Sequence, residues 1–215
     1  MKYVSVDLET TGLDESYCQI LEFAAVIGDT TDFCTPVEEF PSLTYRFYYD
    51  RVIGDPYALH LNRGLLNDMV SRPSSYLYIN IDSLWSSFAN WLDTQKFAIE
   101  GKVMLAGKNV GSFDRRFLNK VPRWDWRRFH HRYLDPAHYF FKPLTDAVLP
   151  DTKECIKRSG INWEDFRLHT ALNDARLVVE LLRKGFQLHE NAVFLMDQSH
   201  ADAGSDRASC PDSSE

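Results

Sequence analysis

The sequence lacks any apolar stretch long enough to cross a membrane. No uninterrupted apolar run approaches the roughly 20 residues that span a bilayer, and the first residues lack the basic and then apolar pattern of a secretory signal peptide. We therefore expect a cytoplasmic protein that has no membrane partner.

Cysteine is scarce, and its spacing argues against two kinds of site. The four cysteines are far apart in the sequence and form no C-x-x-C pair. A zinc ribbon or a dense disulfide framework needs closely spaced cysteines, so we expect neither. The sequence predicts four reduced thiols, at Cys18, Cys34, Cys155 and Cys210.

Internal repeats are also absent, and one substantial core is expected. The chain has 215 residues, of which 44% are hydrophobic, and this is ordinary for a single folded domain. We assign that domain to residues 1–197. Residues 198–215 are small, polar and acidic, and such a segment cannot bury enough apolar area to offset the entropy lost on ordering. We predict that this tail is disordered in solution.

The net charge of −7 is unfavourable for a nucleic-acid partner, but its distribution is uneven. Residues 114–132 carry one lysine and six arginines against two aspartates, interleaved with Trp124, Trp126 and Phe129. Such a segment can hold phosphates and stack bases. It can equally be a solvated helix face, and the sequence alone leaves both interpretations open.

The hydrophobic patterns predict a mixed α/β fold. An antiparallel three-stranded meander comes first, followed by short helices, a crossover helix, and a further strand and helix, so part of the sheet is expected to be parallel. Ser112 is the predicted N-cap of its helix, and Gly160 and Gly185 are expected to end the last two helices. The predicted strands are 2–6, 19–28, 42–49, 102–106 and 132–135, and the predicted helices lie within 55–69, 81–97, 112–119, 152–159 and 170–184.

Asp7 and Glu9 lie at the outgoing end of the first predicted strand. Successive strand side chains alternate faces, so carboxylates at i and i+2 project from the same side, about 7 Å apart along the strand. A pair in that geometry can share divalent metal ions. Read alone, it can also be a solvated turn that runs into the following Thr-Thr-Gly, so other acidic residues must decide.

Two further acids and a histidine occupy comparable positions. Asp114 falls in the first turn of a helix that directly follows a strand, which is where ligands collect in open α/β sheets. His169 comes just ahead of the last predicted helix, and Asp174 lies in its first turn after the predicted cap Thr170. Each acid could instead complement its helix dipole. The occurrence of Asp7, Glu9, Asp114, His169 and Asp174 together is what indicates a site.

These motifs carry a resemblance. D-L-E-T-T-G-L with Asp7 and Glu9, F-D-R-R-F-L with Asp114, and H-x-x-x-x-D with His169 and Asp174 occur in the order seen in the DEDDh 3'-to-5' exonucleases of the DnaQ-like, RNase H-like superfamily. The match covers roughly residues 1–186. It implies an RNase H-like α/β fold with a five-stranded mixed sheet flanked by helices, and an enzyme that hydrolyses single-stranded nucleic acid to nucleoside 5'-monophosphates.

The central segment resembles oligoribonuclease within that superfamily. Asn109 precedes D-R-R-F-L at the oligoribonuclease spacing, and F-H-H-R-Y-L-D follows at 129–135. His131 departs from the pattern, because oligoribonucleases carry there a tyrosine that completes the active site of the partner subunit. The homodimer and the preference for very short substrates are therefore left open.

Other features resemble the DNA-directed members. Residues 55–62, DPYALHLN, are similar to the D-P-x-A segment of proofreading-type DnaQ exonucleases, and Phe113 in the F-D pair is also more DnaQ-like. The sequence therefore leaves open single-stranded RNA or DNA as the substrate, with short oligonucleotides favoured. A proofreading or repair exonuclease is the alternative, and a catalytically silent nucleic-acid-binding accessory protein is a further one.

The resemblance also implies roles for the residues. Two Mg²⁺ or Mn²⁺ ions suit a site made of four acids. By the family pattern Asp7 bridges both ions, Glu9 and Asp174 complete the shell of the catalytic one, Asp114 supports the second, and His169 is the general base. The implied substrate contacts are Thr10, Thr11, Gly12, Leu13, Asn62, Asn109 and Phe113, each of which could instead serve packing or capping.

Overall fold

The computed structural model describes residues 1–95, 102–162 and 169–205, with side chains described as far as residue 191. Residues 198–205, expected to belong to the tail, lie in the last helix. The remaining tail residues 206–215, Cys210 among them, fall outside the described residues. The other three cysteines are free thiols, as predicted.

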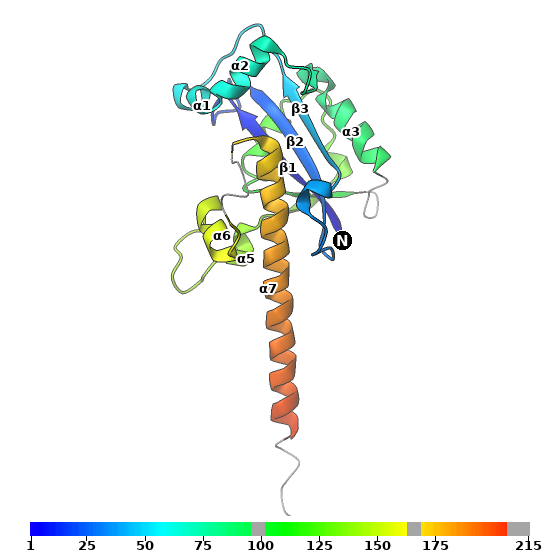
Figure 1. Cartoon of the computed structure of the whole chain (residues 1–215), viewed down its shortest axis with the longest axis vertical. Coiled ribbons are helices and arrows are strands. Elements are labelled where there is room, and N and C mark those ends of the chain that lie inside the picture. The colour runs from blue at the N-terminus through cyan, green and yellow to red at the C-terminus, as the bar shows by residue number, and fades with distance from the viewer. Residues whose placement is uncertain (96–101, 163–168, 206–215) are drawn as a thin grey trace, which may run out of the picture.

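A six-stranded mixed sheet forms the centre of the molecule (Figure 1). The first three strands make the predicted antiparallel meander, while β5 pairs in parallel with β1, and β6 with β5. The prediction of five strands missed β4, which has only two residues and pairs with β3. In sheet order the strands are β4 (Tyr78–Ile79), β3 (Ser42–Phe47), β2 (Ile20–Asp29), β1 (Lys2–Thr10), β5 (Val103–Ala106) and β6 (Phe129–Leu134).

Helices cover both faces of the sheet (Figure 1). Val4, Val6 and Leu8 of β1 pack in one core cluster with residues of α3, whereas Tyr3 packs in another with residues of α7. Because strand side chains alternate, Asp7 and Glu9 share the α7 face with Tyr3. The helices are α1 (Pro56–Leu61), α2 (Arg63–Ser71), α3 (Leu84–Thr94), α4 (Asp114–Leu118), α5 (Ala137–Phe140), α6 (Thr152–Ser159) and α7 (Ala171–Ser205).

The α7 helix is much longer than predicted. It runs through Gly185, the expected end, to Ser205, and projects well beyond the sheet (Figure 1). Gly185 serves packing instead of termination, since a Cβ there would lie 2.5 Å from Cγ of Tyr139. No helix among the described residues is both long and apolar enough to cross a membrane.

The predicted N-cap at Ser112 is wrong. The helix begins at Asp114, and the preceding residue, Phe113, makes no side-chain cap. The Ser112 hydroxyl donates instead to the Asn109 carbonyl at 3.2 Å. Asn109 has a positive φ of 59° and turns the chain between β5 and α4, so Ser112 stabilises this turn.

The aromatic residues of the basic segment belong largely to the core. Phe129 is buried, and its ring stacks on that of Trp124 with an interplanar angle of 8°. Arg128 pairs with Asp93, and Arg127 pairs with Asp125 at 2.8 Å. These contacts favour a structural role for the segment over a base-stacking surface.

Candidate active site

Three carboxylates from two elements converge on one point. Asp7 and Glu9 project from the end of β1, and Asp174 projects from the first turn of α7. One carboxylate oxygen of each lies within 4.8 Å of the other two. The pairing of β1 with β2 slips between Glu9 and Thr10, so the chain leaves the regular sheet just after these acids.

Asp114 stands behind this group. Its side chain is buried, and its carboxylate accepts hydrogen bonds from its own backbone N–H and from that of Leu8. It therefore joins the start of α4 to β1. Asp114 is close enough to raise the pKa of Asp7, but it is not in the group of three whose oxygens converge.

The crowded carboxylates resist ionisation. Burial is the largest cause for every one of them, and for Asp7 the charges of Asp114, Asp174 and Glu9 add to it. The pKa of Glu9 rises to about 8, that of Asp114 to about 7 and that of Asp174 to about 6, and that of Asp7 rises well above its ordinary value. A divalent cation would reverse this penalty, and hard oxygen ligands suit Mg²⁺ and Mn²⁺.

His169 is held at the mouth of the site. It has a positive φ of 76°, and its backbone N–H donates to Oδ2 of Asp174 at 3.2 Å. Its side chain lines a cavity of about 290 Å³ together with Asp7 and Asp174. Thr170 caps α7 by accepting a hydrogen bond from the backbone of Asn173 at 3.3 Å, as predicted.

A buried ion pair behind the acids went unnoticed in the sequence. Glu22, directly opposite Glu9 in β2, accepts hydrogen bonds from Nε of Arg46 and from the backbone N–H of Ala171, each at 2.8 Å. Arg46 also pairs with Asp68 of α2 at 2.6 Å. Glu22 thus ties the first residue of α7 to the sheet, and a lone acid inside the apolar stretch QILEFAAV was the available signal.

Five of the seven predicted substrate-contact residues gather in one pocket beside the acids. This pocket, of about 350 Å³, is also lined by Glu9. The sequence analysis named Asn62 at the end of the 55–62 segment, but it did not name Tyr57, Ala58 and Leu61 of α1, which also line the pocket. Leu13 and Tyr57 are 73% and 79% exposed, so their apolar surfaces are available for a ligand. The five residues are Thr10, Gly12, Leu13, Asn62 and Phe113.

The other two predicted contacts have structural partners. Thr11 is fully buried, and its hydroxyl donates to the Ile53 carbonyl at 2.6 Å. The backbone N–H of Asn109 donates to Oδ2 of Asp135 at 2.9 Å. Neither residue is among the described lining of the pocket. Asn62 does line it, yet its amide also donates to the Thr10 carbonyl at 3.0 Å, which holds the chain just after Glu9.

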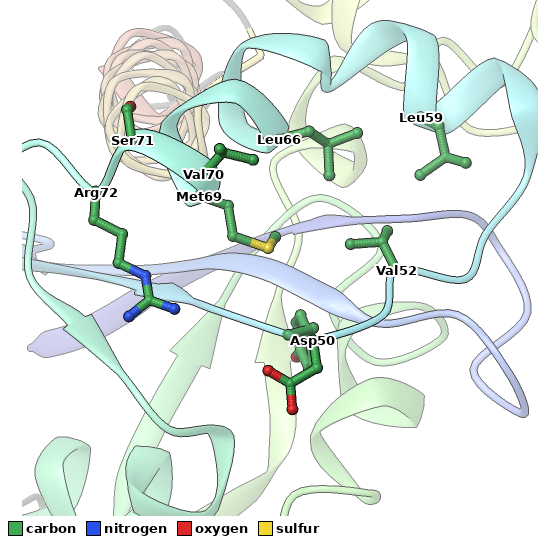
Figure 2. Close-up of a pocket in the computed structure, with 9 residues that line it drawn as sticks. Asp50, Val52, Leu59, Leu66, Met69, Val70, Ser71 and Arg72 are labelled. Atoms are coloured by element: carbon green, nitrogen blue, oxygen red, sulfur yellow. The ribbon is translucent and has the colours of Figure 1, made fainter.

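A larger cavity, of about 730 Å³, contains none of the predicted site residues. Figure 2 shows Leu66 and Met69 of α2 above Val52, with the charged groups of Asp50 and Arg72 near its rim. A choice of the active site by cavity volume alone would therefore have missed the converging acids.

Comparison with known proteins agrees with the geometry. No family model matches the chain. It is 26% identical over 168 residues to oligoribonuclease of Dichelobacter nodosus, with 71% of this chain and 88% of the relative covered. It is 28% identical over 197 residues to that of Vibrio cholerae, with 88% and 93% covered.

Solved structures share the fold at lower identity. The nuclease domain of 3'hExo, a DEDDh family member bound to rAMP, aligns with a TM-score of 0.62 at 16% identity, covering 86% of this chain and 92% of that one. A full-length 3'-exonuclease aligns with a TM-score of 0.61 at 14% identity, covering 89% and 82%. The motif order and the similarity to oligoribonucleases support a DnaQ-like 3'-to-5' exonuclease of the oligoribonuclease type.

Proposed function

We propose that this chain degrades short single-stranded oligonucleotides from the 3' end to nucleoside 5'-monophosphates, with the help of two divalent cations. The observation that carries the proposal is the convergence of Asp7, Glu9 and Asp174 within 4.8 Å, beside a largely apolar pocket. The oligoribonucleases it resembles supply the substrate class.

The donor set fits hard divalent cations. Asp7, Glu9 and Asp174 would hold the ions directly, and Asp114 would support them. Bound Mg²⁺ or Mn²⁺ would activate the attacking water and neutralise the charge that develops on the phosphate. The raised pKa values of Glu9 and Asp174 reflect a site short of positive charge, which is what such ions provide.

His169 is the proposed general base. Its side chain is exposed at the mouth of the cavity that Asp7 and Asp174 line. A neutral imidazole can take a proton from the attacking water near pH 7. The hydrogen bond from its backbone to Asp174 holds the histidine beside the acids.

The pocket beside Glu9 is the proposed 3'-nucleoside site. Leu13 and Phe113 offer apolar surfaces for the terminal base, and Tyr57 faces the same space. The backbone from Thr10 to Gly12 would contact the 3' end in this proposal. Its position is fixed by the Thr10 hydroxyl, which donates to the Gly12 carbonyl at 2.7 Å.

A DNA-directed proofreading or repair exonuclease is the second candidate. It is favoured by the segment that resembles DnaQ exonucleases, because Asp55, Ala58 and Asn62 from that segment line the nucleoside pocket. A catalytically silent accessory protein is disfavoured, since it would have no chemical need for all five residues of the motif. Cytoplasmic location and a homodimer stay predictions.

Digestion of 5'-labelled RNA and DNA of two to about twenty nucleotides, with Mg²⁺ or Mn²⁺, tests the proposal. We expect stepwise loss from the 3' end, fastest for short RNA. Faster digestion of DNA would favour the second candidate. Asp7→Ala should abolish cleavage, which also excludes a contaminating nuclease, and failure of the wild-type protein on both substrates would refute both candidates.

A further inference from the structure

Asp55 lies at the N-cap position of α1, yet its side chain makes no cap for that helix. Aspartate is favoured at such a position because its carboxylate can accept a backbone N–H of the first helical turn. Both carboxylate oxygens instead bind the loop of residues 11–19, which follows β1. Oδ1 accepts a hydrogen bond from the Tyr17 hydroxyl at 2.5 Å, and Oδ2 accepts one from the backbone N–H of Leu13 at 3.3 Å.

We propose that Tyr17 and Asp55 are a positioning pair for the 3'-terminal nucleoside of the substrate. They join the loop that carries Leu13 to α1, and so fix the distance between two walls of the nucleoside pocket, the 350 Å³ cavity beside Glu9. Asp55 lines this pocket, whereas Tyr17 is not among its described lining residues. Tyr17 therefore acts on a bound nucleoside only through Asp55 and the loop. The inference rests on the exonuclease function proposed above.

The base of the loop and the chain that leads into α1 are in direct backbone contact. The backbone N–H of Asp55 donates to the Thr11 carbonyl at 2.7 Å, and the Thr11 hydroxyl donates to the Ile53 carbonyl. Two glycines allow this approach, because a Cβ on Gly12 would overlap the Asp55 carboxylate and one on Gly54 would overlap the Thr11 backbone. The backbone thus fixes the base of the loop, and the part beyond Gly12 is left to side-chain contacts.

Leu13, in that outer part, is held by side chains on both sides of its peptide backbone. Asp55 accepts its N–H, and its carbonyl accepts a hydrogen bond from Arg116 of α4 at 3.3 Å. Arg116 also pairs with Glu15 of the same loop at 3.3 Å. The Leu13 side chain is largely exposed, so these polar contacts, more than packing, fix its position. A wall that is already held in place loses less conformational freedom when the nucleoside binds.

Two substrates that differ only in the terminal base test this role. One is a short RNA with a normal 3' residue, and the other ends in 1-deoxyribofuranose, which has no base but keeps the 2'- and 3'-hydroxyls. For Tyr17→Phe we expect the ratio of kcat/KM between the two to fall about fivefold, as for one lost hydrogen bond. The change should come from a higher KM for the RNA with the base, with kcat unchanged, because the converging acids are untouched.

A double-mutant cycle tests whether the two residues act together. Asp55→Ala should lower the ratio more than Tyr17→Phe, because it also releases the N–H of Leu13. In that background Tyr17→Phe should cause no further loss. Asp55→Asn should keep most of the ratio, since its amide can donate to the Tyr17 hydroxyl while its carbonyl accepts from Leu13.

The matched control is Tyr48→Phe. Tyr48 is another exposed tyrosine, and it is not among the described lining residues of the nucleoside pocket. Loss of its hydroxyl should leave the ratio and the rates unchanged. Thermal melting verifies that each variant is folded, which is expected for Tyr17→Phe because this side chain is 46% exposed.

Amide hydrogen exchange reports the loop without any substrate. In Tyr17→Phe and in Asp55→Ala the peptide that contains residues 11–19 should exchange faster than in the wild-type protein, and in Tyr48→Phe it should exchange at the wild-type rate. A lower ratio with unchanged exchange would mean that the Tyr17 hydroxyl touches the substrate itself, and this would overturn the positioning role.

Further outcomes would also overturn the inference. Equal losses on both substrates would mean that the pair does not act on the terminal nucleoside, and additive losses in the cycle would mean that Tyr17 and Asp55 act separately. An unchanged ratio in an active Tyr17→Phe enzyme would refute this inference alone. A wild-type protein that cleaves neither substrate would refute the exonuclease function as well, and so is a distinguishable result.

Discussion

His169 is the one member of the proposed catalytic set whose side chain is exposed. It is not in the group of converging side chains that could hold a metal ion, which consists of Asp7, Glu9 and Asp174. His169→Ala should therefore lower kcat by about 10²–10⁴, the usual value of a general base, while the cation concentration for half-maximal activity changes little. His189→Ala, an exposed histidine further along α7, is the matched control. Near-wild-type turnover of His169→Ala at neutral pH would exclude the general-base role.

Glu22 acts on the site from behind. A glutamine there has one carbonyl oxygen to share between Arg46 and the backbone of Ala171, so Glu22→Gln leaves a buried guanidinium short of a partner. We expect a loss of about 3–5 kcal/mol in unfolding free energy, measured by urea denaturation. Activity should also fall at a temperature where the variant stays folded, because the first turn of α7 carries Asp174.

Asp68→Asn is the control for Glu22→Gln. It removes the other ion pair of Arg46, but its side chain is 36% exposed. A loss of about 0–1 kcal/mol is expected, as for partly solvated pairs, with activity unchanged. Equal effects of the two substitutions would show that Glu22 has no special link to α7.

Residue spacing predicted the positions of Asp7, Glu9 and Asp174, but not the residues that support them. Strand alternation put Asp7 and Glu9 on one face, and Asp174 was expected in a first helical turn, as the structure has it. Glu22 and Arg46 gave no comparable signal, because their pairing depends on strand register, which a local pattern does not give. Thr11 shows the same limit, since its partner Ile53 is far away in the sequence.

At the level of elements, Gly185 shows why a local stop signal failed. Glycine costs a helix interior about 1 kcal/mol relative to alanine, so Gly185→Ala would stabilise an isolated helix. In this protein the new Cβ would meet the Tyr139 ring at 2.5 Å. We therefore expect a net loss of about 1–3 kcal/mol from overpacking, measured by thermal or urea denaturation.

A double-mutant cycle with Tyr139→Ala isolates this packing contact. In a protein that already lacks the ring, Gly185→Ala should be neutral or stabilising, because only the gain in helix propensity remains. Destabilisation of the same size in both backgrounds would contradict a role for Tyr139. The Tyr139 ring also meets Phe186 edge to face, so Tyr139→Ala alone is expected to be destabilising.

The remaining errors at this level arise from short elements and from tertiary contacts. β4 has two residues, too few for any alternation to appear. The basic segment does carry the positive charges on which a nucleic-acid surface was considered. Its aromatic residues Trp124 and Phe129, however, pack in the core and are not available to stack bases. The strands and helices that have long apolar patterns were predicted from the sequence. Burial of one continuous face produces a period that the sequence shows directly.

At the scale of the molecule, the acids make the cation-free fold sensitive to pH. Carboxylates ionise near pH 4 in the unfolded chain, whereas in the folded protein the pKa of Glu9 is about 8, that of Asp114 about 7 and that of Asp174 about 6. Between these limits the folded state binds more protons than the unfolded state. Stability must therefore fall as pH rises, and bound divalent cations must offset the loss.

Melting of chelator-treated protein between about pH 5 and 8 tests this linkage. We expect Tm to fall across that range, and Mg²⁺ or Mn²⁺ to raise it more at the upper end, where the acids are free to bind. Asp7→Asn removes one of the buried charges that repel Glu9 and Asp174, so its Tm without cations should fall less and should exceed that of the wild-type protein near pH 8. The control is Lys157→Met, whose side chain is 78% exposed and does not line the cavity that holds Asp7 and Asp174, and it should follow the wild-type curve. Parallel curves for Asp7→Asn and wild type would show that repulsion among the acids does not set the pH dependence.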